Sequence, residues 1–158
     1  MAKLTHIDEQ GRVRMVDVTA KAPTERMARA QAVVTMTEET FALIADQKVK
    51  KGNVLETARI AGIMAAKKTS DVIPMCHPLN LTHAQVDFYP DPDIHGIRIE
   101  ATARIVDQTG VEMEALTAAA VAALTIYDMC KAYDRAMVVS DIRLLEKRGG
   151  KSGTWTRE

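Results

Sequence analysis

The chain has 158 residues, a length that suits one domain able to bury a stable core without disulfides. Hydrophobic residues make up 47% and charged residues 27%, a globular composition that excludes a disordered chain. Lys plus Arg and Asp plus Glu each number 21, so the net charge is zero and the basic excess of a generic nucleic-acid binder is missing.

The chain begins with an arm, a strand and a short helix. Residues 1–27 are polar and are predicted to form an N-terminal arm. Small and apolar residues alternate with polar ones over 28–36, which is the period of a strand with one buried face. Thr37 suits a helix N-cap, and we expect a short helix that ends near Asp46.

A second helix is predicted over 54–66, where Asn53 begins a sequence that resembles a capping box. The next segment, 69–81, fits neither the helix period nor the strand period. Pro74 and Pro78 exclude a helix interior and a central strand, because proline lacks the backbone N–H. We therefore expect an ordered loop here.

A hairpin, a long helix and a last strand complete the chain. The hairpin pairs 84–89 with 97–106, where apolar and polar residues alternate most regularly. An Ala-rich helix is predicted from about 112 to 133, followed by a strand over 137–145. Residues 147–158 are predicted to be a flexible, basic, Gly-rich tail.

The element order is strand, helix, strand, strand, helix, strand (βαββαβ). This order predicts an α+β, ferredoxin-like fold, in which an antiparallel sheet carries helices on one face. No linker or internal repeat divides the sequence, so we expect residues 1–158 to form a single domain. Because many chemistries share this architecture, function has to be argued from a site.

The long helix carries a candidate acid–base pair. Asp128 and Lys131 are three residues apart and share a helix face, where an exposed ion pair contributes only ~0.2–0.5 kcal/mol. Their neighbours Tyr127, Cys130 and Tyr133 indicate a partly buried face instead. Burial lowers a lysine pKa while a nearby aspartate raises it, so Lys131 is a candidate general acid or base.

The proline-bracketed loop holds Met75, Cys76 and His77. Adjacent residues of an extended chain face opposite sides, so a Cys–His nucleophile pair is not expected, and the histidines and cysteines lack the spacing of a zinc site. A hydrogen-bonded loop histidine is the simpler interpretation of His77. Glu112 and Glu114 either stabilise the N-terminus of the long helix or bind the donor edge of a guanine-like ring.

Two stretches of the chain are basic. Residues 47–68 hold six cations and one anion, and residues 143–158 hold five cations and two anions. Both suit either a solvated surface or a polyphosphate site, because several phosphate charges require several cations. Gly150-Lys151-Ser152 is similar to the end of a P-loop, but Leu145 stands where that motif needs glycine, so a P-loop is rejected.

The cysteine content and the apolar segments indicate a cytoplasmic protein without membrane contact. Cys76 and Cys130 cannot form a disulfide framework, and reduced thiols suit the cytoplasm. The longest apolar stretch, 118–124, is far shorter than the ~18 residues of a membrane span. Residues 1–6 contain no signal-peptide core.

Five motifs stand out along residues 5–153. They are Met15-Val16-Asp17-Val18-Thr19, Lys51-Gly52-Asn53-Val54, Pro74-Met75-Cys76-His77-Pro78, Gly110-Val111-Glu112-Met113-Glu114-Ala115-Leu116-Thr117 and Tyr127-Asp128-Met129-Cys130-Lys131. Together, and in this order, they closely resemble the cyclic pyranopterin monophosphate synthase family of molybdenum cofactor biosynthesis.

The resemblance implies a ferredoxin-like catalytic domain, a lyase that converts 3′,8-cyclo-7,8-dihydro-GTP into cyclic pyranopterin monophosphate and releases pyrophosphate. It implies catalytic roles for Asp128, Lys51 and Lys131. It implies substrate binding by the residues that match the pocket of the family: Met75, Cys76, His77, Glu112, Met113, Glu114, Arg26 and Lys147. The partner it implies is the chain itself, in a hexamer built as a trimer of dimers. No cofactor and no protein metal site are expected, although Mg²⁺ suits the pyrophosphate.

One inference is independent of the resemblance. Glu114 and Asp128 lie 14 residues apart, which is roughly 21 Å along a continuous helix. Either the two groups serve opposite ends of the nucleotide, or two subunits share each site. Our hypothesis is the second, in which this helix packs antiparallel against its copy in a dimer.

The sequence leaves two other function classes to consider. A non-catalytic regulatory domain that binds a nucleotide stays open, and turnover separates it from an enzyme. An RNA-binding module with the same element order needs stacking aromatics, whereas aromatic residues make up 4% of this chain and form no run.

Overall fold

The computed structural model describes residues 6–158. Residues 1–5, which belong to the predicted arm and to the segment expected to lack a signal-peptide core, lie outside the described residues. The elements are β1 Thr24–Thr35, α1 Glu38–Ala45, α2 Val54–Lys67, α3 Thr69–Val72, β2 His83–Asp91, β3 Gly96–Asp107, α4 Glu112–Cys130, β4 Val138–Arg148 and β5 Trp155–Thr156.

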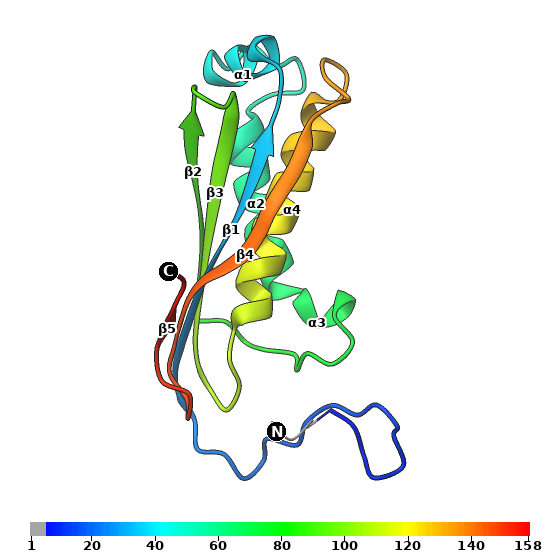
Figure 1. Ribbon diagram of the computed structural model, residues 1–158, viewed down its shortest axis with the longest axis vertical. Helices are drawn as coiled ribbons and strands as arrows, with labels where there is room; N and C mark the ends of the chain where they lie inside the picture. Colours follow the sequence, from blue (N-terminus) through cyan, green and yellow to red (C-terminus); the bar gives the residue numbers. More distant parts are fainter. Residues whose placement is uncertain (1–5) are drawn as a thin grey trace.

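One antiparallel sheet, in the order β2-β3-β1-β4-β5, forms the centre of the fold. The long helices α2 and α4 lie side by side on one face of the sheet, and α1 lies at one end (Figure 1). The α+β, ferredoxin-like prediction is therefore confirmed.

Local sequence patterns account for most of these elements. The five alternate residues predicted for the buried face of β3 all lie in the core: Ile97, Ile99, Ala101, Ala103 and Ile105. The Thr37 hydroxyl accepts the N–H of Thr40, and Asn53 accepts the N–H of Glu56, so both predicted N-caps are present.

Small residues allow α2 and α4 to approach closely. A Cβ added at Gly62 would lie 3.0 Å from the carbonyl oxygen of Ala118 and 3.0 Å from Cγ2 of Val86. By length and composition, α4 is apolar enough to cross a membrane, but core helices pass the same test, and α4 packs on the sheet. Because α4 packs against both α2 and the sheet, it runs along the sheet from one end of the molecule to the other.

Several sequence-based assignments were wrong. Strand β1 begins at Thr24, inside the arm predicted for residues 1–27, and β4 extends to Arg148, inside the tail predicted for residues 147–158. The segment expected to be loop throughout contains the single-turn helix α3, and the long helix ends at Cys130 rather than near residue 133. Sequence patterns also gave no indication of β5, which pairs with β4 inside the predicted tail. The flexibility of that tail stays a prediction.

The direction of α4 defines two ends of the molecule. The N-terminus of α4, the segment after α3 and the N-terminal arm lie at one end, whereas the C-terminus of α4 lies near α1 at the other (Figure 1). The predicted site residues are divided between these two ends.

Candidate functional site

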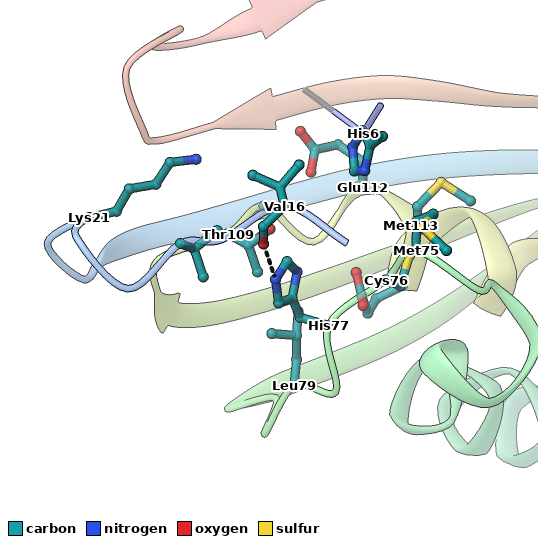
Figure 2. A pocket seen from close by; sticks show the side chains of 13 residues that line it. His6, Val16, Lys21, Met75, Cys76, His77, Leu79, Thr109, Glu112 and Met113 are labelled. Carbon is teal, nitrogen blue, oxygen red and sulfur yellow. Dashed lines mark hydrogen bonds between the residues drawn. The ribbon is translucent and has the colours of Figure 1, made fainter. Parts of the chain in front are cut away.

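Six of the predicted substrate-binding residues line one pocket of about 280 Å³ at the N-terminus of α4. They come from two segments, the proline-bracketed loop and the first turn of α4: Met75, Cys76, His77, Glu112, Met113 and Glu114. Figure 2 shows these side chains together with Val16 from the arm. Residues far apart in the sequence therefore meet here.

His77 fastens the loop to the arm. Its Nε2 lies 2.8 Å from the carbonyl oxygen of Val16, the contact drawn as a dashed line in Figure 2. Because a carbonyl oxygen only accepts, Nε2 is the donor in this contact, and Nδ1 is left to accept a hydrogen bond. The predicted hydrogen-bonded loop histidine is thus present, and its ring also lines the pocket.

Glu114 is the most perturbed carboxyl group of the pocket. Its side chain is buried, and burial, with a further contribution from the charge of Glu112, raises its pKa to about 7. Burial also raises the pKa of the Cys76 thiol, and the nearby Glu114 adds to this shift. Cys76 is therefore a neutral thiol at neutral pH rather than an activated nucleophile.

The shift of Glu114 predicts a pH dependence of stability. Between its unperturbed pKa of 4.5 and its folded value of about 7, folded chains hold a proton that unfolded chains have lost. The free energy of unfolding should therefore fall as pH rises through this window, by about 1–3 kcal/mol. Glu114→Gln cannot ionise and should lack this loss. Urea unfolding at fixed protein concentration from pH 4.5 to 8 tests this, and equal slopes for the two proteins would disprove it.

A second group lies at the opposite end of α4. The Nζ of Lys131 lies 2.6 Å from Oδ1 of Asp128, and the Nζ of Lys51 lies 3.7 Å from Oδ2 and 2.8 Å from the backbone oxygen of Asp128. Hydrogen bonding from Lys131, followed by the charges of Lys131 and Lys51, lowers the pKa of Asp128. Two ammonium groups therefore hold this carboxylate in its ionised form.

The surroundings of this lysine–aspartate cluster differ from the sequence-based expectation. Its side chains are 47% (Lys51), 61% (Asp128) and 51% (Lys131) exposed, so the predicted partly buried face is wrong for the isolated chain. The aromatic and sulfur neighbours point elsewhere: Cys130 is fully buried, and the hydroxyl of Tyr127 donates to the backbone of Arg135. Within one chain, water reaches the cluster freely.

Arg26 lies in a third region, a pocket of about 600 Å³ that it lines together with Lys21 and Lys151. Arg26 donates from Nη2 to the carbonyl of Gln108, and its buried Nε has no hydrogen-bond partner among residues 6–158. Gly150, at φ +73°, packs so tightly that a Cβ there would collide with Nη1 of Arg26. Lys147 does not line this pocket, but it donates to the hydroxyl of Ser152, which does.

Sequence reasoning missed Lys21, which lines both the pocket at α4 and the pocket at Arg26. It is an isolated lysine in a polar arm, and no local pattern distinguishes it. Three cations of the basic stretch 47–68 have acidic partners: Lys48 pairs with Asp46, Arg59 pairs with Glu56, and Lys51 contacts Asp128.

Comparison with known proteins places this arrangement in a family. Residues 15–150 match the MoaC family. A protein of Desulforapulum autotrophicum is 63% identical over 98% of this chain and 95% of its own length, and one of Desulfatibacillum aliphaticivorans is 61% identical over 100% and 99%. A protein of Chloroflexus aurantiacus is 60% identical over 98% and 95%. All three are named cyclic pyranopterin monophosphate synthase, and this chain belongs to the MoaC family.

Proposed function

We propose that this chain is a cyclic pyranopterin monophosphate synthase that converts 3′,8-cyclo-7,8-dihydro-GTP into cyclic pyranopterin monophosphate and pyrophosphate. The observation that carries the proposal is the whole-length similarity to relatives of that name. Pyrophosphate leaves when a ribose hydroxyl attacks the α-phosphate, which makes the enzyme a phosphorus–oxygen lyase. Its proposed location is the cytoplasm.

The three regions suit three parts of this substrate. Buried Glu114 and its neighbour Glu112 suit the N–H donors of the pterin ring, while His77 suits a phosphate or a proton transfer. Arg26, Lys147 and Lys21 offer cations to the phosphates, and they neutralise charge that develops on the leaving pyrophosphate. Asp128, Lys51 and Lys131 are the groups for acid–base steps.

We propose that the reaction requires no cofactor. The conversion rearranges rings and eliminates pyrophosphate without a net change in oxidation state, so no electron carrier is needed. The chemistry of pyrophosphate oxygens suits Mg²⁺, which usually binds through phosphate oxygens and a few carboxylates rather than in a protein cage.

We propose that two copies of the chain share each site. The pocket at the N-terminus of α4 and the lysine–aspartate cluster lie at opposite ends of a continuous helix, as the sequence spacing required. Leu124 on α4, and Ile60 and Met64 on α2, are exposed apolar side chains. Antiparallel contact through these helices would cover them and bring the cluster of one copy to the pocket of the other. Three such dimers form the proposed hexamer.

Arg26→Ala should raise KM roughly 10- to 150-fold with a smaller change in kcat, because a charge-assisted hydrogen bond to phosphate contributes about 1.5–3 kcal/mol. Steady-state kinetics test this. Arg104→Ala is the matched control, because Arg104 is an exposed arginine on the neighbouring strand β3. A normal KM for Arg26→Ala would contradict the phosphate role.

The proposed function is tested by incubating the purified protein with 3′,8-cyclo-7,8-dihydro-GTP and measuring product and pyrophosphate together. Stoichiometric release of both supports the enzyme. Saturable binding without turnover would instead support the alternative, a non-catalytic regulatory domain.

A further inference from the structure

We propose that Tyr133 is a positioning residue for Lys51. The hydroxyl of Tyr133 accepts the backbone N–H of Lys50 at 3.0 Å, one residue before Lys51. These two residues are 83 positions apart, so the contact links the segment between α1 and α2 to the turn that follows α4. The proposal rests on the acid–base role assigned to Lys51 in the proposed function.

The turn that carries Tyr133 is held from several sides. The N–H of Tyr133 donates to the carbonyl of Cys130 at 2.8 Å. The buried carboxylate of Asp134 accepts the N–H of Thr37 at 2.9 Å and that of Ala136 at 2.9 Å. These hydrogen bonds tie the turn to Thr37 at the start of α1 and to Ala136 two residues further on, so the position of the Tyr133 hydroxyl is fixed.

The loop that carries Lys51 is anchored on both sides by Val49 and Val54, which are buried in the core, whereas Lys50 and Lys51 between them are exposed. Gly52, at φ +112°, donates its N–H to Val49 at 3.0 Å, which closes a tight turn around Lys50 and Lys51. The Lys51 side chain is 47% exposed, and its Nζ contacts lie on Asp128 alone among the described residues. A long exposed side chain has many rotamers, so the position of its backbone decides how often Nζ reaches Asp128.

The contact therefore sets the geometry between two of the proposed catalytic groups. Asp128 lies on the last turns of α4, and Tyr133 lies just beyond the end of that helix. The Tyr133–Lys50 hydrogen bond thus ties the Lys51 backbone to the same rigid element that carries Asp128. Without it, the Lys51 loop would move relative to the carboxylate, and misplacement of a catalytic group lowers turnover more than substrate binding.

Tyr133→Phe removes the acceptor while keeping the ring, and Tyr127→Phe is its matched control. The Tyr127 hydroxyl, on α4, donates at 3.0 Å to the backbone oxygen of Arg135, so it anchors the same turn while its hydrogen bond does not involve the Lys51 loop. Loss of one neutral hydrogen bond should lower kcat of Tyr133→Phe about 3- to 10-fold, leave KM within about 2-fold, and leave kcat of Tyr127→Phe unchanged.

Two readouts separate positioning from a general structural effect. Hydrogen exchange of the Lys50 amide should become faster in Tyr133→Phe but not in Tyr127→Phe. In a Lys51→Arg background, adding Tyr133→Phe should have little further effect on kcat, because both changes disturb the same contact between residue 51 and Asp128.

The outcomes are distinct. Wild-type kcat in Tyr133→Phe, an equal loss in Tyr127→Phe, or full additivity with Lys51→Arg overturns the positioning role. Full activity of Lys51→Ala instead overturns the catalytic role of Lys51 and therefore the part of the proposed function on which the inference rests.

Discussion

Lys51→Ala and Asp128→Asn should each lower turnover by at least ~100-fold, the low end of general acid–base contributions. The Asp128 carboxylate accepts a hydrogen bond from Lys131 and lies 3.7 Å from Nζ of Lys51, whose hydrogen bond goes to the Asp128 backbone oxygen. Asparagine at this position carries no charge and loses the electrostatic pairing with both ammonium groups. Alanine at position 51 removes one of the two amines that face this carboxylate. The measurement is the rate of product formation at saturating substrate.

Fold and assembly should survive both changes. All three side chains of the lysine–aspartate cluster are about half exposed, so neither change leaves a cavity or a buried unpaired charge. Lys48→Ala is the matched control, since Lys48 is an exposed lysine near Lys51 that pairs with Asp46. Full activity in Lys51→Ala or Asp128→Asn, with normal circular dichroism and size-exclusion profiles, would contradict the catalytic assignment.

The elements with strong local patterns could be predicted from the sequence. The period-2 pattern of β3 and the caps Thr37 and Asn53 depend on residues within one or two turns of each other, and the structure confirms them. Strand β5 could not be predicted, because a two-residue strand forms only when β4 presents a free edge beside it. Whether β4 has a free edge depends on the strand order of the whole sheet, not on the residues of β5.

The candidate site shows the same division between local and non-local information. The spacing of Asp128 and Lys131 predicts their contact, which the helix places at 2.6 Å. No spacing connects Lys51 to Asp128, or the loop 75–77 to Glu114, and these groupings depend on how α2, α3 and α4 pack. The resemblance to a known family named these residues, but it did not give their division between the two ends of α4.

The exposure of the lysine–aspartate cluster also has a physical reason. The sequence pattern 127–133 mixes aromatic and sulfur side chains with Asp128 and Lys131, and it predicts one partly buried face. On the helix, Met129 and Cys130 turn into the core, while Asp128 turns outward. The apolar neighbours therefore indicated burial of the adjacent helix face, not of the charged one.

The shared site is tested most directly by mixing two variants, Lys51→Ala and Glu114→Gln, in one assembly. Glu114→Gln should lower turnover because it removes the carboxylate proposed to bind the N–H donors of the pterin ring. Each variant damages a different end of α4, so a mixed dimer would contain one intact pocket facing one intact lysine–aspartate cluster. Random mixing should restore about a quarter of wild-type turnover, because one in four pairings is intact. Mixing Lys51→Ala with Asp128→Asn should restore nothing, because both changes lie in the same cluster.

Co-expression with two different affinity tags, followed by purification over both, yields the mixed assemblies for this assay. Recovery only in the first mixture is the result that the account predicts. Mixed assemblies whose turnover does not exceed the mean of the two parent variants would contradict a site built from two chains.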